Sequence, residues 1–281
     1  MVMREAASVG PTPHDLVKAA LEKDSVGSIA RVRELFRMSD PHGYVQLLSD
    51  NAKRNKKIVP LVIGSHQSHA DGVGASGITM QFNRQFQMVL SDTALNGVQS
   101  QELGEVIGYA LPGLSDAGIV DIVGVITEGD IEKGRAEHKV NKRAIAKLLT
   151  GVRRGQGIVL WPDGTLAHGR EAKAGNLDYV PDLPDPKIVI ALARRMMEKG
   201  FEPWGIYYAV DGSWQILDPD DLLITDEAGK RFFQDGAPKP LADIWVGGLI
   251  SPEEFSKAED DYFIMEKITA TLRQGLASRA A

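Results

Sequence analysis

An uninterrupted apolar run at residues 58–63, I-V-P-L-V-I, is followed within a few residues by histidines, a carboxylate and glycines. The run has no alternating polar positions, which is typical of a strand buried on both faces of a sheet. A polar hinge at residues 64–68 then precedes a glycine-spaced segment that we expect to open a helix. His66, His69 and Asp71 therefore lie where the strand ends, and open α/β sheets bind ligands just beyond the carboxyl ends of their strands.

Strand and helix patterns alternate along the rest of the chain. Apolar and β-branched runs predict further strands at residues 85–92, 118–126, 157–161, 204–210 and 243–250. Helical periodicity predicts helices at residues 14–23, 25–36, 41–48, 96–110, 130–152, 188–199 and 251–276. Residues 165–187 contain few apolar side chains and predict a long loop. The alternation predicts an α/β fold with a mostly parallel mixed sheet flanked by helices.

Helices are predicted near both ends of the chain, after a loose arm at the N-terminus. Residues 1–13 indicate a loose arm, and Asp40 and Pro41 are typical of the N-cap and first position of a helix. We therefore divide the chain into an N-terminal helical segment, residues 1–55, and an α/β domain, residues 56–281. A capping box with proline at the first helical position, Ser251 to Glu254, opens the last predicted helix.

Composition excludes several classes of function. The net charge of −6 argues against a chain built to hold nucleic acid. The absence of cysteine excludes thiolate metal ligands and a cysteine nucleophile. The first residues are charged and too weakly apolar for a signal peptide, and no apolar run approaches the ~20 residues that span a bilayer. We expect a cytoplasmic protein, with peripheral contact to a membrane surface as a further option.

The spacing of His66 and Asp71 permits an acid–base pair. On one continuous helix, residues five apart point about 140° away from each other. The two side chains meet only if His66 lies on the loop and Asp71 in the first turn of the helix. Asp71 would then accept one ring N–H and leave the other nitrogen of His66 free as a general base.

Three other interpretations of this stretch are open. His66, His69 and Asp71 resemble a metal-ligand cluster, although no second histidine cluster accompanies them. Gly72, Gly74 and Gly77 satisfy the dinucleotide-binding fingerprint G-x-G-x-x-G, with Asp92 twenty residues after the first glycine. The glycines can instead serve close packing of a helix on the sheet, with His69 as a hydrogen-bonded structural residue.

A second stretch, I-V-L-W-P-D-G-T at residues 158–165, helps to choose among these interpretations of the first. A strand stops there at Pro162, and Gly164 exposes backbone N–H groups at a strand end. Such groups can hold a phosphate or a developing oxyanion. Pro-Asp-Gly is equally a good sequence for a plain β-turn.

Together the two stretches resemble the glycerolipid acyltransferases, the lysophosphatidate and glycerol-3-phosphate acyltransferase family. The family's first motif, a histidine and an aspartate separated by four residues, matches His66 and Asp71. Its later motif, phenylalanine-proline-glutamate-glycine-threonine-arginine, is similar to W-P-D-G-T-L at residues 161–166, where Leu166 replaces the arginine. The intermediate motif, with its arginine, has no counterpart. The resemblance covers residues 58–210, and the chain is closest in character to the soluble plastid-type enzymes.

The resemblance implies an O-acyltransferase that needs no metal and no cofactor beyond its co-substrate. That co-substrate is an acyl thioester of acyl carrier protein or coenzyme A. His66 would be the general base and Asp71 would orient it. The acceptor would be a hydroxyl, of glycerol-3-phosphate or a lysophospholipid. The residues implied in acceptor or phosphate binding are Asp163, Gly164, Thr165, Lys139, Arg170 and Lys173. The alternatives are a nucleotide-dependent oxidoreductase and a non-catalytic lipid- or acyl-carrier-binding relative.

Overall fold

The computed structural model describes residues 10–91, 100–125, 139–163, 167–176, 183, 187–221 and 223–280. The strands are β1 (Phe36–Ser39), β2 (Ile58–Gly64), β3 (Phe86–Ser91), β4 (Ile119–Val125), β5 (Gly157–Leu160), β6 (Glu202–Asp211) and β7 (Ala242–Ile250). The helices are α1 (Pro13–Lys23), α2 (Ser25–Arg33), α3 (Tyr44–Arg54), α4 (Asp71–Thr79), α6 (Ser100–Asp116), α8 (Lys139–Arg153), α9 (Ala167–Lys173), α10 (Ile188–Glu198), η1 (Ser213–Gln215), α11 (Asp226–Phe232), α12 (Pro252–Lys257) and α13 (Tyr262–Ala280).

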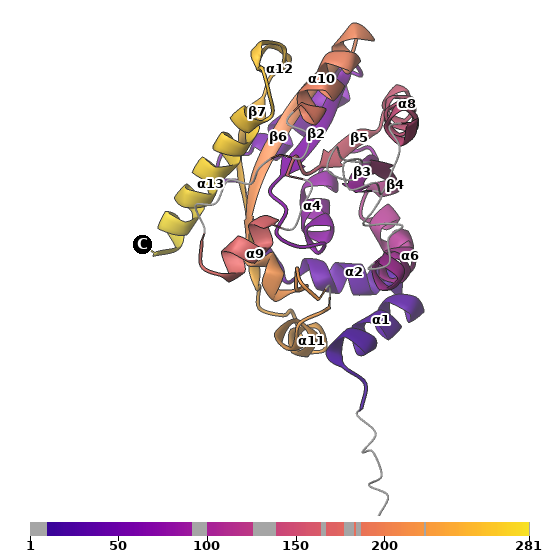
Figure 1. Ribbon diagram of the computed structural model, residues 1–281, viewed down its shortest axis with the longest axis vertical. Helices are drawn as coiled ribbons and strands as arrows, with labels where there is room; N and C mark the ends of the chain where they lie inside the picture. Colours follow the sequence, from indigo (N-terminus) through magenta and orange to yellow (C-terminus); the bar gives the residue numbers. More distant parts are fainter. Residues whose placement is uncertain are drawn as a thin grey trace, which may run out of the picture.

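The strands form a seven-stranded sheet in the order β1-β7-β6-β2-β5-β3-β4 (Figure 1). Neighbouring strands are parallel except for β6 and β7, which pair antiparallel. The predicted α/β class with a mostly parallel mixed sheet is therefore confirmed. Because β2, β5 and β3 are parallel neighbours, their carboxyl ends meet at one edge of the sheet. The loop that follows β2 and carries His66 begins at this edge, as does the turn that follows β5 and carries Trp161.

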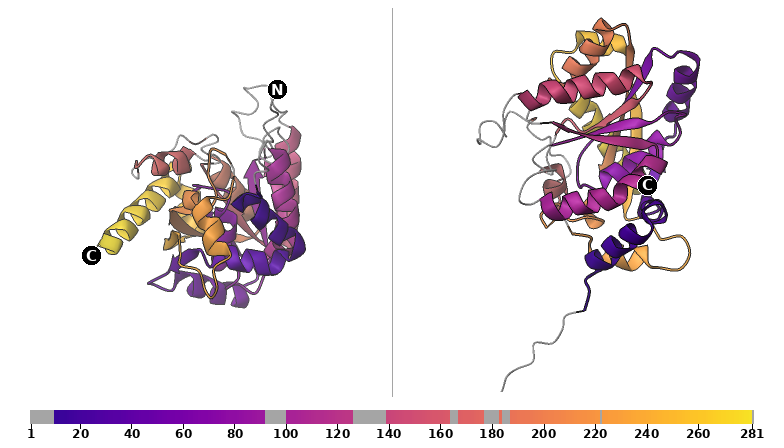
Figure 2. Two further views of the ribbon diagram at one scale, coloured as in Figure 1. Left: turned by 90° about the horizontal axis from the view of Figure 1, so that it is seen from below. Right: turned by 90° about the vertical axis from the view of Figure 1, so that its right-hand side faces the viewer.

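Helices cover both faces of the sheet and create two apolar cores (Figure 1). In β2, Val62 faces the core made with α1, α2, α3, α4 and α6, whereas Leu61 and Ile63 face the core made with α8, α10, α12 and α13. Successive strand residues point to opposite faces, which explains why the whole run from residue 58 to 63 is apolar. Helices α1 and α2 pack beside α6 at one end of the molecule (Figure 2).

The N-terminal segment also contributes a strand, which sequence patterning missed. The helix predicted at residues 25–36 ends at Arg33, and Phe36 begins β1, which pairs with β7 at the sheet edge. With four residues, β1 is too short to show alternation. The next helix begins at Tyr44 with Gly43 as its N-cap, so the predicted start at Asp40 and Pro41 is wrong. Asp40 nevertheless accepts hydrogen bonds from the N–H groups of Tyr44 and Val45.

Three further differences concern the C-terminal half. The predicted loop at residues 165–187 contains the short helix α9, and helix α11 was not predicted. The capping box at Ser251 is confirmed, but the single helix predicted from there is two, α12 and α13. Asp261 lies at the break, where its carboxylate accepts hydrogen bonds from the N–H groups of Val189 and Ile190 and so caps α10.

Candidate active site

The loop that carries His66 begins at Gly64, the last residue of β2. Gly64 pairs in register with Tyr208 of β6. A Cβ atom at Gly64 would lie 2.1 Å from Cζ of Tyr208, so the neighbouring ring requires glycine here. The chain then turns through residues 65–70 into α4, whose first residue is Asp71. The predicted placement of His66 on the loop and Asp71 in the first helical turn is confirmed.

Asp71 is fully buried and holds the loop by one carboxylate oxygen. Its Oδ2 lies 3.2 Å from Nδ1 of His66 and accepts hydrogen bonds from the N–H groups of Gln67 (2.7 Å) and Ser68 (2.9 Å). An ionised carboxylate acts only as an acceptor, so the contact with His66 places the ring proton on Nδ1. The Nε2 atom of His66 then carries the lone pair.

An aromatic side chain from the second stretch fixes the ring of His66. The ring stacks on Trp161, with centroids 5.1 Å apart and an interplanar angle of 28°. Trp161 in turn donates its indole N–H to the hydroxyl of Tyr208 at 3.0 Å. Burial, followed by the charge of Asp71, raises the pKa of Tyr208 well above 10, so the phenol keeps its proton. The sequence did not predict that Trp161 and Tyr208 would contact each other or support His66.

Asp163 positions the backbone of His66. It is fully buried, and its Oδ2 accepts the His66 backbone N–H at 3.0 Å. The resemblance implies acceptor binding for Asp163, and that role stays a prediction beside the contact with the His66 backbone. Gly164, Thr165 and Leu166 lie outside the described residues, as does the side chain of Lys139, the first residue of α8.

The loop is also tied to the carboxyl end of β6 and to η1. The Ser65 hydroxyl accepts the N–H of Val210, and Gln67 Oε1 accepts the N–H of Gly212, each at 3.0 Å. The Ser68 hydroxyl donates to the carbonyl of Ser213 at 3.1 Å. Each of the three partners lies 145 residues further along the chain, so the spacing within the motif could not reveal these contacts.

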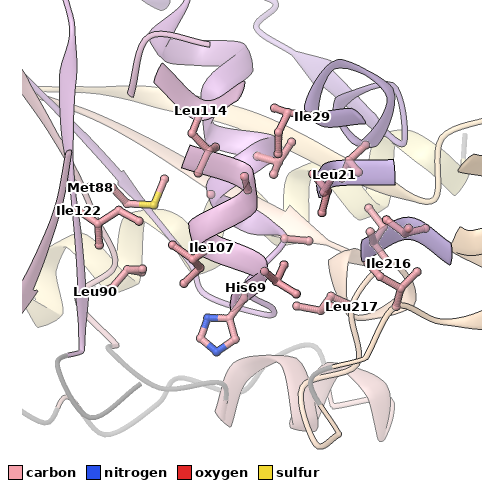
Figure 3. A pocket seen from close by; sticks show the side chains of 18 of the residues that line it. Leu21, Ile29, His69, Met88, Leu90, Ile107, Leu114, Ile122, Ile216 and Leu217 are labelled. Carbon is pink, nitrogen blue, oxygen red and sulfur yellow. The ribbon is translucent and has the colours of Figure 1, made fainter. Parts of the chain in front are cut away.

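An apolar cavity is lined at one end by His66, His69 and Trp161. Its other walls come from α1, α2, α4, α6, β3 and β4 and from Ile216, Leu217 and Ile224 (Figure 3). Leu21, Ile29 and Leu114 are among the aliphatic side chains that face it (Figure 3). The N-terminal helices thus build part of the candidate site.

His69 shares this cavity with His66. The two rings lie edge to face, with centroids 5.4 Å apart. Burial among apolar side chains, with a smaller effect of His66, lowers the pKa of His69 from 6.5 to about 3. His69 is therefore neutral at physiological pH.

Helix α9 lies against the His66 loop, but its two cations are already paired. A Cβ atom at Gly169 would lie 1.7 Å from the carbonyl oxygen of Gln67, so the backbones of α9 and the loop touch. Arg170 contacts Asp220 at 2.9 Å, and Lys173 contacts Asp220 at 3.1 Å and Asp218 at 2.8 Å. Both cations implied in phosphate binding thus have carboxylate partners, and their binding of phosphate stays a prediction.

The glycine fingerprint has a packing explanation at two of its three positions. A Cβ atom at Gly72 would lie 3.0 Å from Cε of Met88, and one at Gly74 would lie 2.8 Å from Phe36. Gly77 has room for a side chain, and Asp92 lies outside the described residues. Within the described part of the chain, no three histidine, aspartate or glutamate side chains gather as they would around a metal ion.

Comparison of the chain with protein-family models, curated proteins and solved structures gave no match. Among the residues that the structure describes, no helix has both the length and the apolar character needed to cross a bilayer.

Proposed function

We propose that the chain is an O-acyltransferase that moves a fatty acyl group from an acyl thioester to an acceptor hydroxyl. The observation that carries the proposal is the buried His66–Asp71 pair at the end of an apolar cavity. A general base and an apolar binding space in one place are what transfer of a fatty acyl group requires. Acyl carrier protein or coenzyme A would carry the thioester.

His66 supplies the proton transfers. Its Nε2 removes the proton of the acceptor hydroxyl as the oxygen attacks the thioester carbonyl carbon. The carbon–sulfur bond then breaks, and the imidazolium returns the proton to the departing sulfur, which leaves as a thiol. Asp71 keeps the ring in the required tautomer and stabilises the transient positive charge. General base catalysis of this kind contributes on the order of 10²–10⁴ in rate.

The cavity supplies affinity for the acyl chain. Burial of an acyl chain contributes about 0.8 kcal/mol per methylene group. Side chains of α1 and α2, such as Leu21 and Ile29, contact this space, so the proposal gives the N-terminal segment a direct part in donor binding. A chain entering along this wall would present its thioester at the end that His66 and Trp161 line.

The acceptor is proposed to be a hydroxyl compound, with glycerol-3-phosphate and lysophospholipids as the candidates to test first. Arg170 and Lys173 could hold a phosphate only by exchanging their contacts with Asp218 and Asp220. An acceptor set should therefore include the same alcohols with and without phosphate.

The test is release of free thiol from long-chain acyl-coenzyme A and acyl carrier protein, with the ester product identified by mass spectrometry. We expect His66→Ala and Asp71→Asn to lower the rate by about 10²-fold or more. His42→Ala is the matched control, because His42 is exposed and follows β1, which runs opposite to β2 and so ends at the other edge of the sheet. Equal rates in wild type and His66→Ala, with the fold intact by circular dichroism, would refute the proposal.

A further inference from the structure

His69 has the surroundings of a group that contacts substrate. It lines the same cavity as His66, and the labelled aliphatic side chains extend away from it along the cavity (Figure 3). Among the described residues, no hydrogen bond to its ring is found. The ring is half-buried, so a ligand that enters the cavity can reach it.

The ring of His69 is a neutral donor. The apolar wall lowers its pKa to about 3, and the cavity-lining residues in the described part of the chain include one other titratable group, His66. A neutral imidazole keeps one N–H at all physiological pH values. If His69 serves as this donor, His66 is the group that takes up the proton of the acceptor hydroxyl.

The distance between the rings suits two roles on one carbonyl. Transfer requires a base within about 3 Å of the attacking oxygen and a donor within about 3 Å of the carbonyl oxygen. Two groups that serve one tetrahedral centre in this way must be close neighbours in the structure. The centroids of His66 and His69 are 5.4 Å apart, and both residues line the cavity.

We propose that His69 donates a ring N–H to the carbonyl oxygen of the acyl thioester and stabilises the oxyanion that forms there. This inference rests on the proposed function and makes His69 a second catalytic residue. As the acceptor oxygen bonds to the carbonyl carbon, its proton passes to His66 and the negative charge develops on the oxygen that His69 holds. When the carbon–sulfur bond breaks, the carbonyl re-forms and His66 protonates the sulfur.

The first arm of the test compares three variants. His69→Phe keeps a flat ring without a donor, whereas His69→Asn and His69→Gln keep an N–H at the two positions that the imidazole nitrogens reach. We expect His69→Phe to lower kcat by about 10²–10³-fold with little change in KM for the donor. The better of the two amide variants should recover at least about tenfold of that loss. A kcat of His69→Phe within threefold of wild type, or equal loss in all three variants, would overturn the inference.

The second arm needs no turnover. The infrared carbonyl band of a ¹³C-labelled acyl-coenzyme A is recorded when bound to His66→Ala protein and to the His66→Ala/His69→Phe double variant. We expect the band to lie at lower frequency in the first protein and to return to its unbound position in the second. An identical band in both proteins, or no binding of the thioester to either, overturns the inference.

The two arms separate the two proposals. A wild-type protein that transfers acyl groups, with His69→Phe unimpaired and the band unchanged, refutes the role of His69 alone. A wild-type protein that transfers nothing, together with a band shift that depends on His69 in the His66→Ala background, refutes the acyltransferase proposal and keeps His69 as the group that binds the carbonyl.

Discussion

Replacement of His69 by phenylalanine should remove a pH-dependent loss of stability. The pKa of His69 is about 3 in the folded protein and 6.5 in the absence of the fold. Between these values the unfolded chain binds a proton that the folded chain excludes. Unfolding is therefore favoured as the pH falls, and the stability present above pH 6.5 is lost progressively down to about pH 3.

The size of the effect follows from the same two values. At pH 5 the unfolded histidine is almost fully protonated, whereas the folded one is neutral. At about 1.36 kcal/mol per pK unit, the contribution of His69 to the free energy of unfolding falls by about 2 kcal/mol between pH 7 and pH 5. The change of about 2 kcal/mol is nearly the same for any folded-state pKa of His69 below about 4. Between pH 7 and pH 5, almost all of the proton uptake then occurs in the unfolded state.

Urea unfolding at pH 7, 6 and 5 measures the effect. Other histidines and carboxylates titrate in both proteins, so the quantity of interest is the difference between wild type and His69→Phe at each pH. That difference should shift by about 2 kcal/mol in favour of the variant from pH 7 to pH 5. Curves that run parallel in the two proteins would show that the cavity does not exclude a charge at this position.

Three further substitutions test the support of the site. Gly64→Ala would press on the ring of Tyr208 and should cost about 3 kcal/mol in urea unfolding, and an unchanged midpoint would contradict the close approach. Tyr208→Phe removes the acceptor of the Trp161 N–H and should cost about 2 kcal/mol, and a neutral result would mean that the indole finds another partner. Gly169→Ala pushes α9 off the carbonyl of Gln67, so we expect acyl transfer to fall by roughly a hundredfold, and wild-type rates would show that this contact has no part in catalysis.

The sequence predicted those parts of the site that depend on local geometry. His66 and Asp71 are five residues apart, and the strand, hinge and helix that bring them together are each visible in the pattern around them. The larger strands were predicted to within a residue or two because their apolar runs are long. The short edge strand β1 and the helix α9 have too few residues to show a period.

The parts that depend on distant residues could not be predicted. Trp161 finds its partner Tyr208 on another strand, 47 residues along the chain. Lys173 was assigned to phosphate from its charge and place in a motif, but Asp218 and Asp220 neutralise it from 45 and 47 residues away. A lone histidine such as His69 gives no indication in the sequence of the cavity that it lines.

Acyl transfer by His66→Ala, compared with His42→Ala, decides whether the buried pair works on a thioester. Both variants and wild type are incubated with long-chain acyl-coenzyme A and a mixture of phosphorylated and unphosphorylated alcohols, and thiol and ester are quantified together. We expect one thiol released per ester formed, at equal rates in wild type and His42→Ala, and a rate lower by at least about 10²-fold in His66→Ala. Ester formation by His66→Ala at the wild-type rate would contradict this expectation.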